Sequence, residues 1–143
     1  MKERTLQQYE TAFAKCKEVF LKKTKDYGTS WRILRARSIT DQIYIKAKRI
    51  RTIDETGENK VGDSIESEFV GCVNYGIIAI LQLQMEDKKE LPIELKYEET
   101  ALLFDVIEER VKQKNTDSDV QLQVKMTRMG GKVLEMKKVY KNY

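Results

Sequence analysis

Apolar residues recur at spacings of three and four along much of this chain, which is the period of an α-helix. In the clearest case, about residues 5–27, one stripe contains Leu6, Tyr9, Phe13, Cys16 and Phe20. The 143 residues include one proline and seven glycines, whereas a β-sandwich or barrel needs many Gly and Pro turns. The sequence therefore predicts an all-α fold.

Turn signals divide the chain into four or five helices. Gly28 ends the first helix, and Ser38 with Asp41 three residues later resembles a capping box that opens a second helix, ending at about residue 56. Further helices are predicted at about residues 64–86, 97–114 and from 120 to the end. We expect a four- to five-helix bundle that forms a single domain over residues 1–143, with a core at 1–90 and additional helices at 91–143.

Composition excludes several kinds of chemistry and location. The chain has no histidine, so Ser-His-Asp and Cys-His catalysis and His-based metal sites are excluded. Cys16 and Cys72 lie in apolar patterns and are predicted to be buried free thiols, which suits a reducing compartment. No signal peptide is recognisable, and two glycines and an asparagine interrupt the longest apolar run, residues 69–81. We expect a cytoplasmic protein without membrane contact.

The charge balance permits an anionic ligand without requiring one. Lysine and arginine total 27, aspartate and glutamate total 23, and the formal net charge is +4. No phosphate-binding glycine loop, dinucleotide fingerprint or cysteine metal motif is present. No motif that reads DNA is present either, so direct DNA binding is not indicated.

Two polar residues are predicted to be buried within helices. Lys46 lies in a stripe formed by Ile39, Ile43, Ile50 and Ile53. A buried ammonium needs a carboxylate, a polar network or a bound anion, and the alternative is a lysine that reaches solvent at the edge of the stripe. Asn74 lies in the most apolar helix, where it either fixes helix register or contacts a ligand. Gly71, one turn earlier, would permit close approach of another backbone or a ligand.

The segment from Lys25 to Arg32, with Arg35 and Arg37, combines arginines with aromatic rings. Arginine forks bind phosphate, and aromatic faces stack on nucleobases. The alternative is a solvated basic loop whose Trp31 ring fills the core.

Carboxylates are candidate ligands for magnesium, which helical pyrophosphohydrolases hold with acidic residues on adjacent helices. Glu66 and Glu68 are two residues apart and point in nearly opposite directions on a helix. Asp105 and Glu108 have the required spacing, but no complete two-helix set is visible. Magnesium is therefore a candidate cofactor for which these glutamate and aspartate pairs supply no ligand set.

A set of residues spread over the first half of the chain is shared with one known family. The set is Asp26-Tyr27-Gly28, Trp31-Arg32, Arg35, Ser38, Asp41, Lys46, Arg49 and Asn74-Tyr75. With it, residues 6–83 resemble the bacterial and phage family called nucleotide modification associated domain 1, a domain of unknown function. The resemblance favours a nucleotide or other phosphate-bearing ligand without supplying a reaction.

The resemblance also implies a duplicated unit. Residues 122–143 repeat part of residues 6–27, with Leu122, Gln123 and Thr127 in place of Leu6, Gln7 and Thr11. Chance similarity of two amphipathic helices is the alternative. A second copy would be truncated at Tyr143, and the uncovered face predicts a homodimer. Its contact stripe would contain Leu122, Met126, Met129 and Val133.

The leading functional hypothesis assigns roles to nine residues. Arg32, Arg35 and Arg49 would contact phosphate, and Trp31 or Tyr27 would stack on a base. Lys46 and Asn74 would line the floor, while Asp26 and Asp41 would orient the basic groups or hold a metal, as a magnesium-dependent pyrophosphohydrolase would require. The competing hypothesis is a non-catalytic interaction domain whose polar core residues only fix packing.

Overall fold

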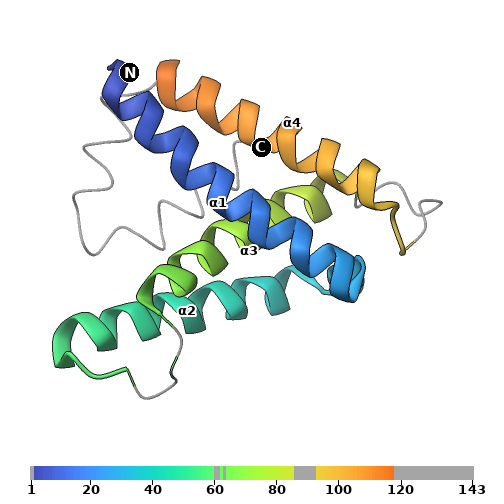
Figure 1. Cartoon of the computed structure of the whole chain (residues 1–143). Helices are drawn as coiled ribbons and strands as arrows, with labels where there is room; N and C mark the ends of the chain where they lie inside the picture. The colour runs from blue at the N-terminus through green and yellow to red at the C-terminus, as the bar shows by residue number, and fades with distance from the viewer. Residues whose placement is uncertain (1, 60–61, 63, 86–92, 118–143) are drawn as a thin grey trace.

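Four α-helices and one short 3₁₀-helix make up the part of the chain that the computed structural model describes, which is residues 2–59, 62, 64–85 and 93–117. The elements are α1 (Glu3–Tyr27), η1 (Ser30–Ile33), α2 (Ala36–Thr56), α3 (Ile65–Met85) and α4 (Tyr97–Asp117) (Figure 1). These residues contain no strand, so the predicted all-α helical bundle is confirmed.

Helix α3 is the central element. It packs against α1, α2 and α4, while α1 and α4 also lie side by side and run in opposite directions (Figure 1). Helices α2 and α3 form an antiparallel hairpin that extends away from the α1–α4 pair. The apolar residues on nearly every side of α3 predict this central position, because each neighbour covers a different face.

Glycines end the first two helices, as their positions in the sequence predict. Gly28 and Gly57 have φ angles of 66° and 71°, and the N–H of each donates a hydrogen bond to a carbonyl in the preceding turn. Positive φ is readily adopted only by glycine. The start of α3 is stabilised by Ser64, whose Oγ accepts a hydrogen bond from the N–H of Ser67 over 3.1 Å.

The predicted start of α2 was wrong. Ser38 does not cap this helix, which begins two residues earlier at Ala36 and has Arg35 at its N-cap without a side-chain hydrogen bond. The N–H of Ile39 bonds to the carbonyl of Arg35, so Ser38 lies inside the first turn. Ala36 and Arg37 are good helix formers, and they extend the helix in the N-terminal direction beyond the predicted Ser38–Asp41 capping box.

The core draws residues from every described helix. Ile39 of α2, Leu81 of α3 and Phe104 of α4 are fully buried, and the rings of Phe20 and Phe104 lie 5.1 Å apart between centroids. By length and composition α3 is apolar enough to cross a membrane, and half of its apolar window is buried inside the fold. The predicted fifth helix, the repeat and the dimer stripe lie outside the described residues.

Candidate functional site

Lys46 and Glu68 face each other across the α2–α3 hairpin. The Lys46 side chain is 18% exposed, and its Nζ lies 3.9 Å from Oε2 of Glu68, which is 3% exposed. The stem of Lys46 lies against Gly71 of α3, and the carboxylate that a buried ammonium needs comes from the same helix. The distance is too long for a hydrogen bond, and Glu68 Oε2 has no hydrogen-bond partner.

Arg49 is the second cation beside Glu68. It lies one helical turn after Lys46, and its NH1 is 3.5 Å from Glu68 Oε1. The Arg49 side chain is 39% exposed, so part of the guanidinium faces solvent. Two cations beside one carboxylate leave one net positive charge, and a guanidinium can bind an oxyanion through several N–H groups.

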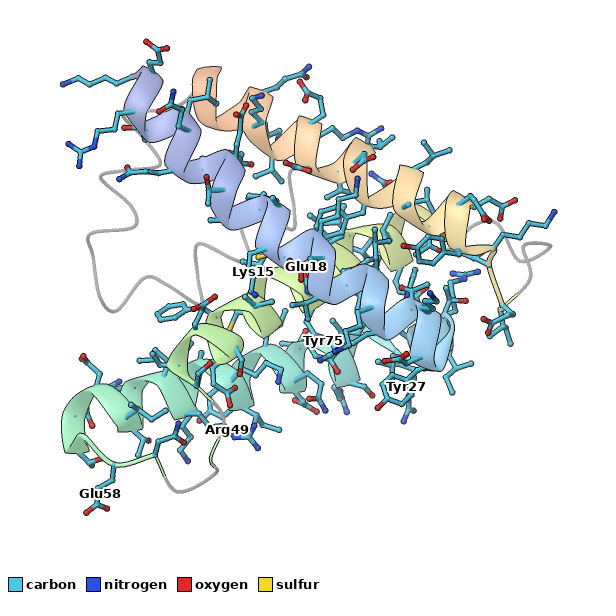
Figure 2. All side chains as sticks on the ribbon, in the orientation of Figure 1. Lys15, Glu18, Tyr27, Arg49, Glu58 and Tyr75 are labelled. Carbon is cyan, nitrogen blue, oxygen red and sulfur yellow. The ribbon has the colours of Figure 1, made fainter. Side chains whose placement is uncertain are left out.

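Gly71 and Tyr75 complete this group, which we call the α2–α3 polar cluster (Lys46, Arg49, Glu68, Gly71 and Tyr75). Gly71 and Tyr75 follow Glu68 at intervals of three and four residues, so all three lie on one face of α3. The Lys46 ammonium lies 5.7 Å from the centre of the Tyr75 ring, within the range of a cation–π contact. Figure 2 labels Arg49 on α2 and Tyr75 on α3.

Asn74 faces α1 and serves the packing of the bundle. Its Nδ2 donates a hydrogen bond to the backbone carbonyl oxygen of Cys16 over 3.0 Å, and its Oδ1 is buried without a partner. Cys16 is buried and Cys72 is half-buried, and both are free thiols. Burial raises the pKa of each thiol, so neither is prepared to act as a thiolate nucleophile.

The arginine- and aromatic-rich segment after α1 is held by Gln82 of α3. Gln82 Nε2 donates to the backbone carbonyls of Trp31, Arg32 and Leu34, and Gln82 Oε1 accepts from NH1 of Arg32 over 2.6 Å. Trp31 belongs to the hydrophobic core and is 8% exposed. The alternative in which its ring fills the core therefore describes the structure, and the ring does not present a face to solvent.

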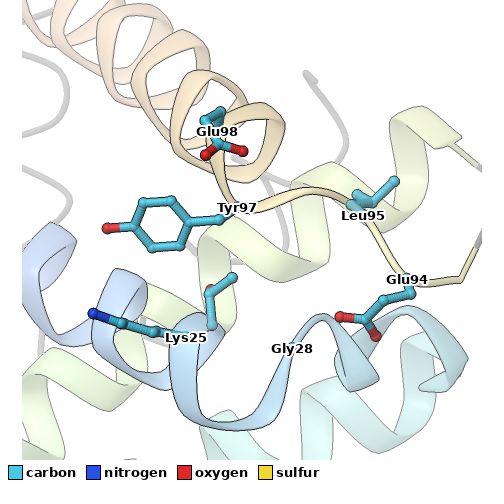
Figure 3. A pocket seen from close by; sticks show the side chains of 7 residues that line it. Lys25, Gly28, Glu94, Leu95, Tyr97 and Glu98 are labelled. Atoms are coloured by element: carbon cyan, nitrogen blue, oxygen red, sulfur yellow. The ribbon is translucent and has the colours of Figure 1, made fainter.

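Hydrogen bonds of Thr29 attach the same segment to the residues that precede α4. Thr29 Oγ1 donates to the carbonyl of Ile93 and accepts from the N–H of Leu95, while the N–H of Thr29 donates to Glu94 Oε1. Beside these contacts lies an open pocket of about 540 Å³ (Figure 3). Its lining residues are Thr24, Lys25, Gly28, Glu94, Leu95, Tyr97 and Glu98.

The predicted phosphate-contacting arginines do not converge. Arg32 contacts Gln82 and Arg49 contacts Glu68, and these two α3 residues are 14 positions apart. At 1.5 Å per residue the separation along the helix is about 21 Å. One small phosphate group cannot bind to both, so the single site inferred from the sequence divides into two regions.

The other predicted site residues lie at the surface. Asp26 and Tyr27 are exposed in the last turn of α1, Arg35 is exposed at the start of α2, and Asp41 is exposed six residues later. Among the described residues no three Asp, Glu or Cys side chains lie close enough to hold a metal ion together. The arrangement of these residues supplies no metal-ligand set, and we derive no hydrolytic step from it.

The comparison with protein families covers both regions. Residues 23–83 match the family model of nucleotide modification associated domain 1. The match confirms the resemblance and includes the α2–α3 polar cluster, the Gln82 contacts and the whole of α2. It covers less than half of the chain. No curated protein and no solved structure matches the chain.

Sequence reasoning missed Glu68 as the partner of Lys46. Glu68 was considered only as a metal ligand, beside Glu66. No local pattern singles Glu68 out, because its sequence neighbours Ser67 and Phe69 are exposed although Glu68 itself is buried. Gly71 was expected to admit a backbone or a ligand, and the structure shows instead that it admits the side chain of Lys46.

Proposed function

We propose that this domain binds a nucleotide or another phosphate-bearing ligand at the α2–α3 polar cluster. The observation that carries the proposal is the pair of cations, Lys46 and Arg49, held beside one buried carboxylate with part of the guanidinium open to solvent. The match to a family associated with nucleotide modification supports this ligand class.

In this proposal Arg49 makes the first contact with phosphate oxygens, because it is the more exposed of the two cations. Glu68 orients both side chains, so that they lose less conformational freedom when the ligand binds. Lys46 adds charge from a site with little solvent, where an ion pair is weakened less by salt than at the surface. Arg32 belongs to the other region and is not part of this contact.

The test is a thermal-shift panel of inorganic pyrophosphate and nucleoside mono-, di- and triphosphates, each with and without magnesium. A ligand at 100 times its Kd stabilises the fold by about 2.7 kcal/mol. Lys46→Met and Arg49→Gln are expected to abolish the shift. Lys48→Met is the matched control, because it removes the same charge from an exposed position of the same helix.

The outcomes of this panel decide whether the ligand binds at the α2–α3 polar cluster. A shift that both cluster variants lose and Lys48→Met keeps supports the site. A shift that all variants keep places the ligand elsewhere and contradicts the proposal. A shift that requires magnesium would make Asp26→Asn and Asp41→Asn the next variants in a hydrolysis assay, since the sequence assigned metal-holding roles to these residues.

The second candidate function is a non-catalytic interaction domain. The observation in its favour is an apolar pair on α4, Leu102 and Val106, which lie one turn apart and are 65% and 48% exposed. If no phosphate compound shifts the melting temperature and Lys46→Met is as stable as the unmodified chain, this function is favoured over ligand binding.

A further inference from the structure

Gly71 lies in the interior of α3, in a conformation that any residue can adopt. Its φ angle is not positive, in contrast to those of Gly28, Gly57 and Gly62. Glycine is less favourable than alanine inside a helix because it loses more backbone freedom on folding. Backbone geometry therefore gives no reason for a glycine at this position, and the reason must lie in the space around it.

That space is filled by Lys46. A Cβ atom on residue 71 would lie 2.6 Å from Cδ, 2.8 Å from Cε and 3.2 Å from Nζ of Lys46. The stem of the lysine thus crosses directly over the α carbon of Gly71 on its way to Glu68. A methyl group there would displace the end of the lysine, which is a flexible side chain, and would leave the backbone of both helices in place.

Gly76 provides the comparison within the same helix. It also lies in the interior of α3, and a Cβ atom on it would have no atom within 4 Å. The two glycines have the same local effect on helix propensity, but only one of them has the lysine against it.

We propose that Gly71 is a positioning residue for the ligand site. Because Gly71 has no side chain, the Lys46 stem can pass over it and the Lys46 ammonium lies between Glu68 and Tyr75, where it meets the phosphate-bearing ligand. This inference rests on the proposed function for the ligand, but the placement of Lys46 can be measured without one. With alanine at position 71 the ammonium moves outward and leaves the carboxylate.

The experiment compares Gly71→Ala with Gly76→Ala in the full chain. The first readout is the acetylation rate of Lys46, measured by peptide mass spectrometry with the exposed Lys48 as internal reference. The second is the affinity for inorganic pyrophosphate and for a nucleoside triphosphate. The third is the melting temperature, which shows that each variant is folded.

Gly71→Ala is expected to remain folded, to speed acetylation of Lys46 several-fold, and to weaken ligand binding about tenfold or more. Gly76→Ala is expected to change neither the acetylation rate nor the affinity. A merely structural role for Gly71 would leave the Lys46 rate relative to Lys48 unchanged in the folded fraction, whatever the melting temperature.

The results separate this inference from the proposed function. If Gly71→Ala leaves the Lys46 acetylation rate unchanged, the positioning role is overturned whatever binds. If the rate rises but the unmodified chain binds none of the phosphate probes, the proposed function fails and the placement of Lys46 by Gly71 stands. If the rate rises and the affinity does not fall, Lys46 is positioned by Gly71 but does not contact the ligand, which overturns the ligand half of the inference.

Discussion

The Asn74 side chain donates a hydrogen bond to the backbone carbonyl oxygen of Cys16, 58 residues earlier in the chain, and so ties α3 to α1 in the buried centre of the bundle. This carbonyl lies within α1, so the bond is made in addition to the backbone hydrogen bonds of that helix. Only one half of the amide is paired, because Asn74 Oδ1 has no partner.

Asn74→Ala is expected to lower the free energy of unfolding by about 1–3 kcal/mol through loss of this bond. Asn74→Asp should cost more, because its carboxylate would be buried facing the Cys16 carbonyl oxygen. Denaturant unfolding of the two variants at neutral pH measures both values. Equal stability of Asn74→Ala and the unmodified chain would show that the bond contributes nothing net.

Gln82 is expected to be the residue that orders the segment between α1 and α2. Gln82→Ala removes the shared donor of three carbonyls and the acceptor of Arg32, so the free energy of unfolding should fall by about 1–3 kcal/mol. Gln84→Ala, a half-buried glutamine of the same helix, is the control and should stay within about 0.5 kcal/mol. Similar losses in both variants would contradict the role of Gln82.

Gly28 should tolerate alanine less well than Gly57 does. Both glycines have positive φ, and alanine at such a position costs of order 1 kcal/mol or more. A Cβ atom on Gly28 would also collide with the Glu94 carboxylate, whereas one on Gly57 would have nothing within 4 Å. Thermal unfolding should therefore rank Gly28→Ala below Gly57→Ala. Adding Glu94→Ala should recover part of the difference, although it also removes the bond to Thr29.

Glu108 is expected to make stability depend on pH. Burial, with the nearby Asp105 as a second cause, raises the pKa of Glu108 above its ordinary value of 4.5. The folded chain then holds this proton more tightly than the unfolded chain does. The stabilisation is present in full below about pH 4.5 and is lost as the pH rises through the folded pKa.

Glu108→Gln should therefore raise the free energy of unfolding at pH 7 by a small amount, less than about 1 kcal/mol because the group is only half-buried and solvent screens its interactions. The gain should disappear at about pH 4. Glu109→Gln, an exposed neighbour, is the control for the loss of one negative charge. A gain at pH 7 that persists at pH 4 would show that the change acts through packing and not through titration.

The helices and their ends could be predicted because their signals are local. The stripe from Leu6 to Phe20 and the stop at Gly28 are separated by a few residues of sequence, and each acts through backbone geometry that hardly depends on the rest of the fold. The start of α2 was predicted less well, since the Ser38–Asp41 signal competes with the helix propensity of the residues before it.

The candidate site could be predicted only in part. The isoleucine stripe indicated that Lys46 either is partly buried beside a carboxylate, a polar network or a bound anion, or reaches solvent at the edge of the stripe. It could not show which carboxylate lies beside Lys46, because Glu68 lies on another helix and faces Lys46 only in the register that α2 and α3 adopt. The separation of Arg32 from Arg49 and the burial of Trp31 depend on the same register.

By itself, then, the sequence determined that this chain is helical, where the first helices end, and that a lysine lies within an apolar face. Only the tertiary structure decided that this lysine crosses Gly71 to reach a buried glutamate, and that the arginines form two regions. The physical reason is that helix period and glycine stops act between neighbours along the chain. The register of two packed helices, in contrast, is set by how all their side chains fill the space between them.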